Sequence, residues 1–351
     1  MKKMLLIVKM AVALVAAAAA SGASSSDPSA AGPVRVRSAS RSLPMLAAMS
    51  NGFFADEGLQ VDYAQFVSSK PTFIQVDQQA IEFVISSMDN AINYQLNPGN
   101  PAGRILDNVI VAGHDLGLGL ALTAALPYPN SESLRGQRVG VDVPHSGFGL
   151  PAEKILLDRG LVADVDYTLL SAGSTPARYE GLLHGSWEAA IINAEGVARA
   201  QDAGLPVIGT VADLFDAYQG GILAGNREWL AAHPETAVGF LRSYVRAIAW
   251  VTDPRNSNAA ISLLIDNATA VPLATRIYNL NVDRNGLAPF GELNLSGFRT
   301  VLELRDEFHG FEAIQDIDRL TSPAGGLYNL SYYGRAVCTL SLGLTCDPRL
   351  I

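Results

Sequence analysis

Three polar residues follow a short apolar run in the first third of the chain. The run Ile81–Ile85 is rich in β-branched and aromatic residues, and Ser87, Asp89 and Asn90 come just after it. Ligands of parallel sheets gather beyond the carboxyl ends of strands, so we predict that at least one of these side chains holds a polar edge of a ligand. Asp89 and Asn90 also suit a cap for a helix over 91–96, and the two roles are compatible.

A second candidate pair, Ser146 and Gly147, stands between a predicted strand at 139–143 and a predicted helix at 150–157. Free backbone N–H groups and the helix dipole at such a junction favour a carboxylate, sulfonate or phosphate. The alternative is a plain helix cap, with glycine permitting a tight turn.

Asn193 and Glu195 follow another strand pattern, Ala189–Ile192, and form a third candidate. They either clamp a ligand from the second half of the chain or lie in a solvated loop. Arg41, which follows the first strand, either pairs with an anionic ligand or is an ordinary surface arginine.

The remaining chemistry-bearing residues show no pattern typical of catalysis. The sequence has no nucleophile elbow, phosphate-binding loop or dinucleotide motif, and Gly117-Leu118-Gly119 lacks the third glycine. We interpret the histidines as structural or exposed and expect neither metal nor cofactor; they are His114, His145, His184, His233 and His309. Asp89 and Glu195 are the only acid or base candidates, so we expect no enzyme activity.

The elements that must position these residues alternate between strand and helix patterns from Val34 onward, as in an α/β fold with largely parallel sheets. Strands are predicted at 34–38, 59–63, 81–85, 109–112, 118–123, 139–143, 167–170, 189–192, 206–210 and 220–224. Helices are predicted at 44–51, 71–79, 150–157, 176–184 and 234–251. The last of these carries Val238, Leu241, Val245, Ile248 and Ala249 along one side.

Two crossings between lobes, near residues 122 and 221, are expected at one hinge. The predicted division is lobe 1 at 34–122 and 222–325, lobe 2 at 123–221, and a C-terminal tail at 326–351. Such a protein opens and closes on a ligand.

The N-terminus has the pattern of a secretory signal peptide. Lys2 and Lys3 precede the apolar run 4–20 and small residues 21–23, which predicts cleavage after Ala23 and a flexible leader at 24–33. A membrane anchor is the alternative, but Lys9 interrupts a run of only about 17 residues, near the lower limit for a span. No cysteine for lipid attachment stands directly after the run, so we expect a periplasmic or secreted protein without a lipid anchor.

The net charge and the cysteines narrow the function further. A formal charge of −9, spread along 351 residues, leaves no basic stripe for nucleic acid or an anionic membrane surface.

Cys338 and Cys346 are too few for a zinc cluster, and in an oxidising compartment we expect a disulfide between them, with two free thiols as the alternative.

Four stretches resemble a known family, the periplasmic substrate-binding proteins of ABC importers for sulfonates, nitrate and thiamine pyrimidine precursors. They are 49–59, 86–90, 134–141 and 178–190, and the resemblance covers about residues 34–300. It implies a two-lobed fold of type II that captures a small organic molecule and delivers it, as a monomer, to a membrane permease. An enzyme on the same scaffold, acting on a pyrimidine or small acid, and a ligand sensor are the competing interpretations.

Overall fold

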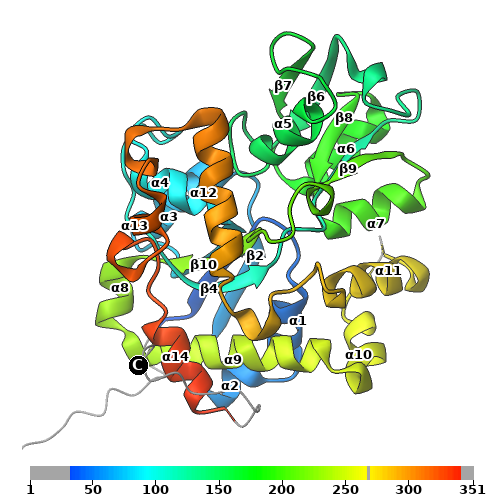
Figure 1. Cartoon of the computed structure of the whole chain (residues 1–351). Helices are drawn as coiled ribbons and strands as arrows, with labels where there is room; N and C mark the ends of the chain where they lie inside the picture. The colour runs from blue at the N-terminus through cyan, green and yellow to red at the C-terminus, as the bar shows by residue number, and fades with distance from the viewer. Residues whose placement is uncertain (1–31, 267–268, 341–351) are drawn as a thin grey trace, which may run out of the picture.

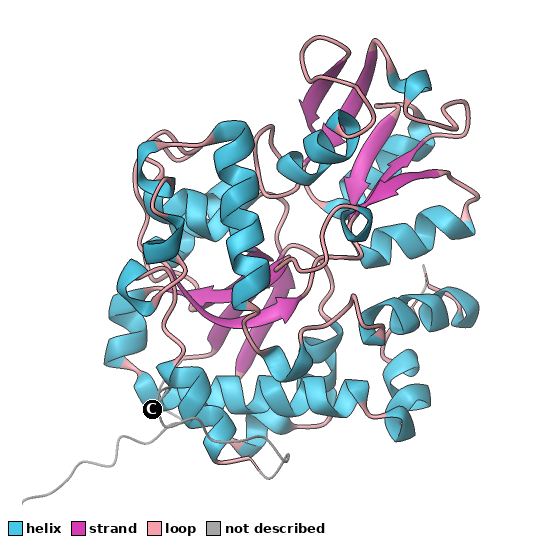
Figure 2. Cartoon of the chain, in the orientation of Figure 1, coloured by secondary structure: helices cyan, strands magenta, loops and turns pink. Residues whose placement is uncertain are grey.

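Two five-stranded sheets form two lobes in the computed structural model, which describes residues 32–266 and 269–340 (Figure 1). The predicted signal peptide and nearly all of the predicted leader lie outside the described residues. We call the first sheet with its helices lobe 1 and the second sheet with its helices lobe 2; in Figure 2 helices flank both sheets.

The sheet of lobe 1 has the strand order β2-β1-β3-β10-β4. Its strands are β1 Val34–Ser38, β2 Val61–Gln65, β3 Phe83–Ser87, β4 Val109–Asp115 and β10 Gly221–Gly225. The sheet of lobe 2 has the order β7-β6-β8-β5-β9, with β5 Ala121–Ala124, β6 Gln137–Val141, β7 Tyr167–Ser171, β8 Ala189–Ile192 and β9 Val207–Thr210.

One strand in each sheet runs against its neighbours, whereas the other four share one direction, so the sheets are largely parallel as expected. β10 is antiparallel to β3 and β4, and β5 is antiparallel to β8 and β9. Both are the first strand that the chain forms after passing from one lobe to the other. A strand that arrives directly from the other lobe follows no helical crossover, so it is free to pair antiparallel.

Seven of the fourteen α-helices that the structure describes connect one strand to the next along the chain. In lobe 1 they are α1 Leu43–Ser50, α2 Phe53–Asp56, α3 Ser69–Asp77 and α4 Met88–Leu96, and in lobe 2 they are α5 Gly149–Leu157, α6 Thr175–His184 and α7 Ala194–Asp202. The chain then continues through α8 Arg227–Ala232, α9 Pro234–Thr252, α10 Ser257–Ser262, α11 Val271–Val282, α12 Leu295–His309, α13 Ile317–Leu320 and α14 Ser331–Cys338.

Helix α9 forms much of the core of lobe 1. Of its predicted apolar side, Val238, Leu241, Val245 and Ile248 are buried, and Ala249 is half-buried. Phe240 stacks on Phe83 of β3 with ring centroids 4.4 Å apart. α14, inside the predicted C-terminal tail, packs against α9, so the described part of this tail belongs to the same core.

The two linkers between the lobes touch each other backbone to backbone. They are residues 116–120, which join β4 to β5, and residues 214–220, which precede β10. A Cβ atom on Gly117 would lie 2.4 Å from the Cα of Gly220, and Gly117 has a φ of +68°. Glycine is therefore required where the linkers cross. The lobe boundaries predicted from the sequence stay predictions.

Candidate functional site

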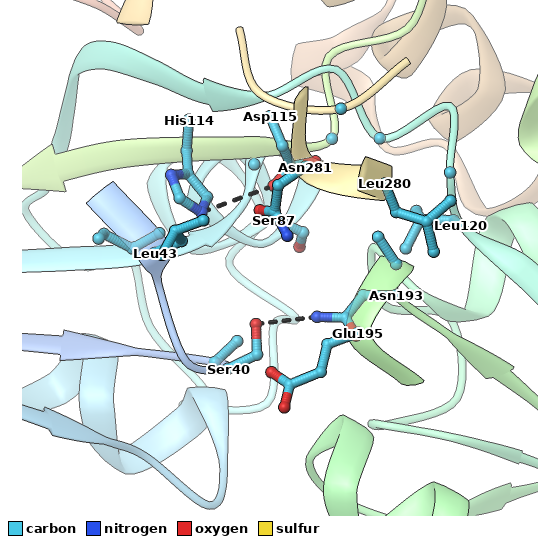
Figure 3. Close-up of a pocket in the computed structure, with 18 of the residues that line it drawn as sticks. Ser40, Leu43, Ser87, His114, Asp115, Leu120, Asn193, Glu195, Leu280 and Asn281 are labelled. Atoms are coloured by element: carbon cyan, nitrogen blue, oxygen red, sulfur yellow. Dashed lines mark hydrogen bonds and ion pairs between the residues drawn. The ribbon is translucent and has the colours of Figure 1, made fainter. Parts of the chain in front are cut away.

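A cavity lies between the lobes, where the carboxyl ends of strands from both sheets meet (Figure 3). The empty space within it, counted together with its opening to solvent, is about 930 Å³. Polar groups from both lobes line it, namely Ser40, Arg41, Ser87, His114, Asp115, Asn193, Glu195, Asn281 and Asn285. Apolar side chains complete the wall, among them Leu43, Leu120, Phe148, Leu264, Ile277 and Leu280.

Five of the eight residues predicted to contact a ligand line this cavity: Arg41, Ser87, Gly147, Asn193 and Glu195. They come from the ends of β1, β3 and β8 and from the loop before α5. Asp89, Asn90 and Ser146 do not line it. Ligand contact by any of the eight stays a prediction.

Ser87 and Asn193 each serve as a helix cap at the end of a strand. The Ser87 hydroxyl accepts a hydrogen bond from the Asn90 N–H at 3.3 Å, and the Asn193 side chain accepts one from the Gly196 N–H at 3.1 Å. Asn193 also donates to the Ser40 hydroxyl across the cleft at 2.8 Å (Figure 3). The predicted cap at Asp89 or Asn90 is wrong, because α4 already begins at Met88 and both residues lie in its first turn. A capping role and a position at the cavity are compatible at Ser87 and Asn193.

Arg41 is already paired with carboxylates. Its guanidinium lies 3.2 Å from Glu195 of lobe 2 and 2.6 Å from Asp266. Glu195 in turn lies 3.0 Å from Arg199. The pair joins the lobes, and an anionic ligand would have to compete with these carboxylates for Arg41.

Asp89, predicted to contact a ligand, forms a buried ion pair and does not line the cavity. Both of its carboxylate oxygens accept hydrogen bonds from Arg305 of α12. The side chain of Asp89 is 1% exposed and that of Arg305 is 2% exposed. Arg305 also donates to the carbonyl of His145 in lobe 2 at 2.9 Å. Replacement of Asp89 would leave a buried arginine without its counter-ion, so this side chain has a structural role.

Asn90 and Ser146 are also engaged within the protein. The Gly147 N–H donates to the Asn90 side chain across the lobes at 3.4 Å. The Ser146 hydroxyl donates to Asp142 and accepts from the Gly149 N–H at 3.3 Å, which is the capping alternative considered above. Burial raises the pKa of Asp142, although Arg178 and the Ser146 hydroxyl oppose this shift.

Gly147 approaches lobe 1 more closely than any larger residue would allow. A Cβ atom at this position would lie 2.3 Å from the hydroxyl oxygen of Ser87 and 2.9 Å from its Cβ. Such separations are well inside van der Waals contact. The absence of a side chain at Gly147 is therefore a condition for the lobes to close as they do here.

His114 and Asp115, at the end of β4, are cavity residues that the sequence interpretation missed. The Asp115 carboxylate accepts hydrogen bonds from the backbone N–H groups of Gly117 and Gly221, and its side chain remains 37% exposed because it faces the cavity. Burial between the lobes raises the pKa of Asp115 and lowers the pKa of His114, whose Nε2 lies 3.9 Å from the Asp115 carboxylate. The signal was available, since both residues follow a predicted strand.

The sequence shows to which protein family the chain belongs. The sequence profile of the NMT1/THI5-like family matches residues 39–257, more than half of the chain. The chain belongs to the NMT1/THI5-like family. No curated protein matches it.

Solved structures share the fold of this NMT1/THI5-like chain at low sequence identity. The periplasmic nitrate-binding protein NrtA of Synechocystis PCC 6803 has a TM-score of 0.73 and 12% identity, over 88% of each chain. A protein of Bordetella bronchiseptica RB50 has a TM-score of 0.69 and 18% identity, over 87% of this chain and 96% of its own. The alkanesulfonate-binding protein SsuA of Xanthomonas axonopodis pv. citri, bound to MOPS, has 0.63 and 13%, over 80% and 94%. The predicted two-lobed periplasmic-binding-protein fold is confirmed.

Within the part of the chain that the structure describes, no helix combines the length and apolar character of a membrane span. Cys338 ends α14, whereas Cys346 lies outside the described residues, so their predicted pairing stays a prediction.

Proposed function

We propose that this protein is a solute-binding protein, which captures a small organic molecule between its lobes and delivers it to the permease of an ABC importer. The observation that carries the proposal is the cavity between the lobes. Polar groups from both lobes line it, and the two linkers that join the lobes touch each other at its edge, as at a hinge. A ligand that contacts both walls stabilises the closed form relative to the open one. A periplasmic or secreted location and a monomeric state, both expected from the sequence, are part of the proposal.

The charges of the cavity favour a neutral or cationic ligand that carries N–H donors, such as an aminopyrimidine. Asp115 presents a carboxylate to the cavity, and its two backbone donors leave acceptor positions free. Among the described residues that line the cavity, the cation is Arg41, and it is shared by two carboxylates. Burial lowers the pKa of His114, which leaves this side chain neutral near pH 7. A sulfonate or nitrate would meet more negative than positive charge, although the relatives named above bind such anions.

The apolar side chains of the cavity support a compact ring in preference to a small inorganic ion. Leu43, Leu120 and Leu280 face the same space as Asp115 and Asn193 (Figure 3). Burial of an apolar ring face against these side chains adds about 25 cal/mol per Å² of apolar surface. The ligand class is therefore a ring with one apolar face and a donor-bearing edge.

Native mass spectrometry of protein purified without refolding would identify a retained ligand, and a thermal-shift screen would test the class directly. We expect aminopyrimidines to raise the melting temperature, because a ligand that binds the folded state alone stabilises it by mass action. MOPS and nitrate serve as anionic comparisons. A selective shift by MOPS would overturn the ligand class, and no shift by any small solute would overturn capture.

The competing enzyme interpretation has its own test. Under the proposal, incubation with a binding compound returns it unchanged. Steady product formation that disappears in Glu195→Ala or Asp115→Asn would establish an enzyme instead. A sensor differs from an importer component in its partner, which a pull-down of the exported protein from detergent-solubilised membranes would distinguish.

A further inference from the structure

Two histidines and one glutamate converge at the side of the cleft that is formed by α5 and α12, away from the cavity described above. They are His145 in the loop before α5, Glu153 on α5, and His309 at the end of α12. Their imidazole nitrogens and carboxylate oxygens all lie within 4.8 Å of one another. The three positions are too far apart in sequence for a metal-binding motif, which is why the histidines were interpreted as structural or exposed.

Each carboxylate oxygen of Glu153 faces a different histidine. Oε2 lies 3.0 Å from His309 Nε2, and Oε1 lies 3.5 Å from His145 Nδ1. Ligands of a tetrahedral zinc ion are about 3.4 Å apart, since the metal–ligand bonds are about 2.1 Å long. The two distances between Glu153 and the histidines are thus within a few tenths of an ångström of the separation that one ion requires, and all three ligand atoms lie within 4.8 Å of one another.

Glu153 is the feature that points to an ion. Its side chain is only 4% exposed, and its Oε1 is buried without a hydrogen-bond partner among the described residues. The neighbouring cations are engaged elsewhere: Lys154 lies 2.5 Å from Glu307, and Arg305 pairs with Asp89. A buried carboxylate oxygen without a donor is costly unless a cation completes it.

The histidines are placed so that an ion can reach them. Their side chains are 46% and 31% exposed, and both line a surface cavity beside the cleft. The backbone of His145 has a φ of +62°, a conformation that side chains other than glycine rarely adopt. Strained positions of this kind concentrate at functional sites.

We propose that His145, Glu153 and His309 bind one divalent transition-metal ion of the zinc type. Two neutral imidazoles and a carboxylate are ligands suited to Zn²⁺, Co²⁺ or Ni²⁺, and solvent completes the coordination. Because α12 packs against α4 of lobe 1 as well as against α5 of lobe 2, the ion strengthens a contact at which the lobes meet. In combination with the proposed function, on which this consequence rests, metal and solute raise each other's affinity because both favour the closed form.

The test is calorimetric titration of Zn²⁺ into full-length exported protein, without a polyhistidine tag and cleared of metal by a chelator. We expect one ion per chain and at least about a tenfold loss of affinity in both His145→Ala and His309→Ala. His184→Ala is the matched control, because His184 is exposed and lies 3.8 Å from Glu180, with no third ligand beside them in the part of the chain that the structure describes; the affinity of this variant should equal the parent's.

Cobalt provides a second measurement that does not depend on solute binding. Visible absorption typical of four-coordinate Co²⁺ should appear with the parent and be lost in both histidine variants. Because Glu153 is buried, the test relies on the two half-exposed histidines and does not require a Glu153→Gln variant to fold. Absence of saturable binding, or binding that survives either histidine substitution, would overturn the three-ligand site. A failed solute screen leaves this result unaffected, so the two proposals fail separately.

Discussion

The guanidinium group of Arg305 donates hydrogen bonds to both carboxylate oxygens of Asp89, and neither side chain is more than 2% exposed. Loss of the carboxylate would leave a buried arginine without its counter-ion. We predict that Asp89→Ala lowers the free energy of unfolding by about 3 to 5 kcal/mol, measured by urea denaturation.

The matched control for Asp89→Ala is Asp62→Ala, which breaks the exposed pair with Arg37. Surface pairs contribute about 1 kcal/mol or less, so this variant should unfold close to the parent. Equal unfolding of the two variants would contradict the assignment of a structural role to Asp89.

Asp89 also marks the limit of what the sequence could predict. The strand-end rule led to Ser87 and Asn193, because the end of a β-rich run is visible locally and the caps of α4 and α7 follow at once. The same rule included Asp89, whose side chain is directed by a residue 216 positions later. Local pattern identifies the end of a strand, but only the fold determines which side chains there face the cleft.

Order along the chain was more predictable than pairing between strands. The predicted strand at 220–224 is β10, and the predicted helix at 234–251 is α9. The antiparallel direction of β5 and β10 was missed because it follows from the passage between lobes, which local periodicity does not record. The convergence of His145 with His309 was missed for the same reason.

We predict that the exported protein carries a disulfide between Cys338 and Cys346. The motivation is the predicted signal peptide, since export exposes thiols to an oxidising compartment. Labelling of free thiols under denaturing, non-reducing conditions should modify no cysteine, and prior reduction should expose two. Two labelled cysteines without reduction would contradict the pairing.

Asp115 should reduce the stability of the ligand-free protein at neutral pH. Burial raises its pKa in the folded state, so on raising the pH through the ordinary value, about 3.9, the unfolded chain releases its proton first. The free energy of unfolding therefore falls with rising pH between the ordinary and the raised pKa, and the loss persists above the raised pKa. We predict that Asp115→Asn melts higher than the parent at pH 7.

This advantage of Asp115→Asn should shrink below about pH 4, where the parent is protonated in both states. Melting curves of both proteins from pH 3 to 8 check the prediction. The variant should also bind the solute about ten- to a hundredfold more weakly, because a hydrogen bond to a charged group contributes about 1.5 to 3 kcal/mol. A difference in melting temperature that is independent of pH would contradict the role of ionisation.

Gly147 should control closure without contributing to either core. A methyl group at this position would lie 2.3 Å from the Ser87 hydroxyl oxygen in the closed form, whereas an open form separates the two residues. We predict that Gly147→Ala weakens solute binding at least about tenfold and gives a larger radius of gyration with solute, by small-angle scattering, than the parent. The melting temperature without solute should change little, because the clash exists only between lobes.

Two further variants distinguish a clash from a general effect of alanine in this loop. Gly149→Ala, two residues on, meets no atom closer than 3.4 Å and should close and bind as the parent does. Replacement of Ser87 by glycine removes both of the nearest atoms, and glycine is nearly as good a helix cap as serine. The double variant Gly147→Ala/Ser87→Gly should therefore recover part of the lost affinity. If it binds no better than Gly147→Ala alone, contact between these two residues is not what limits closure.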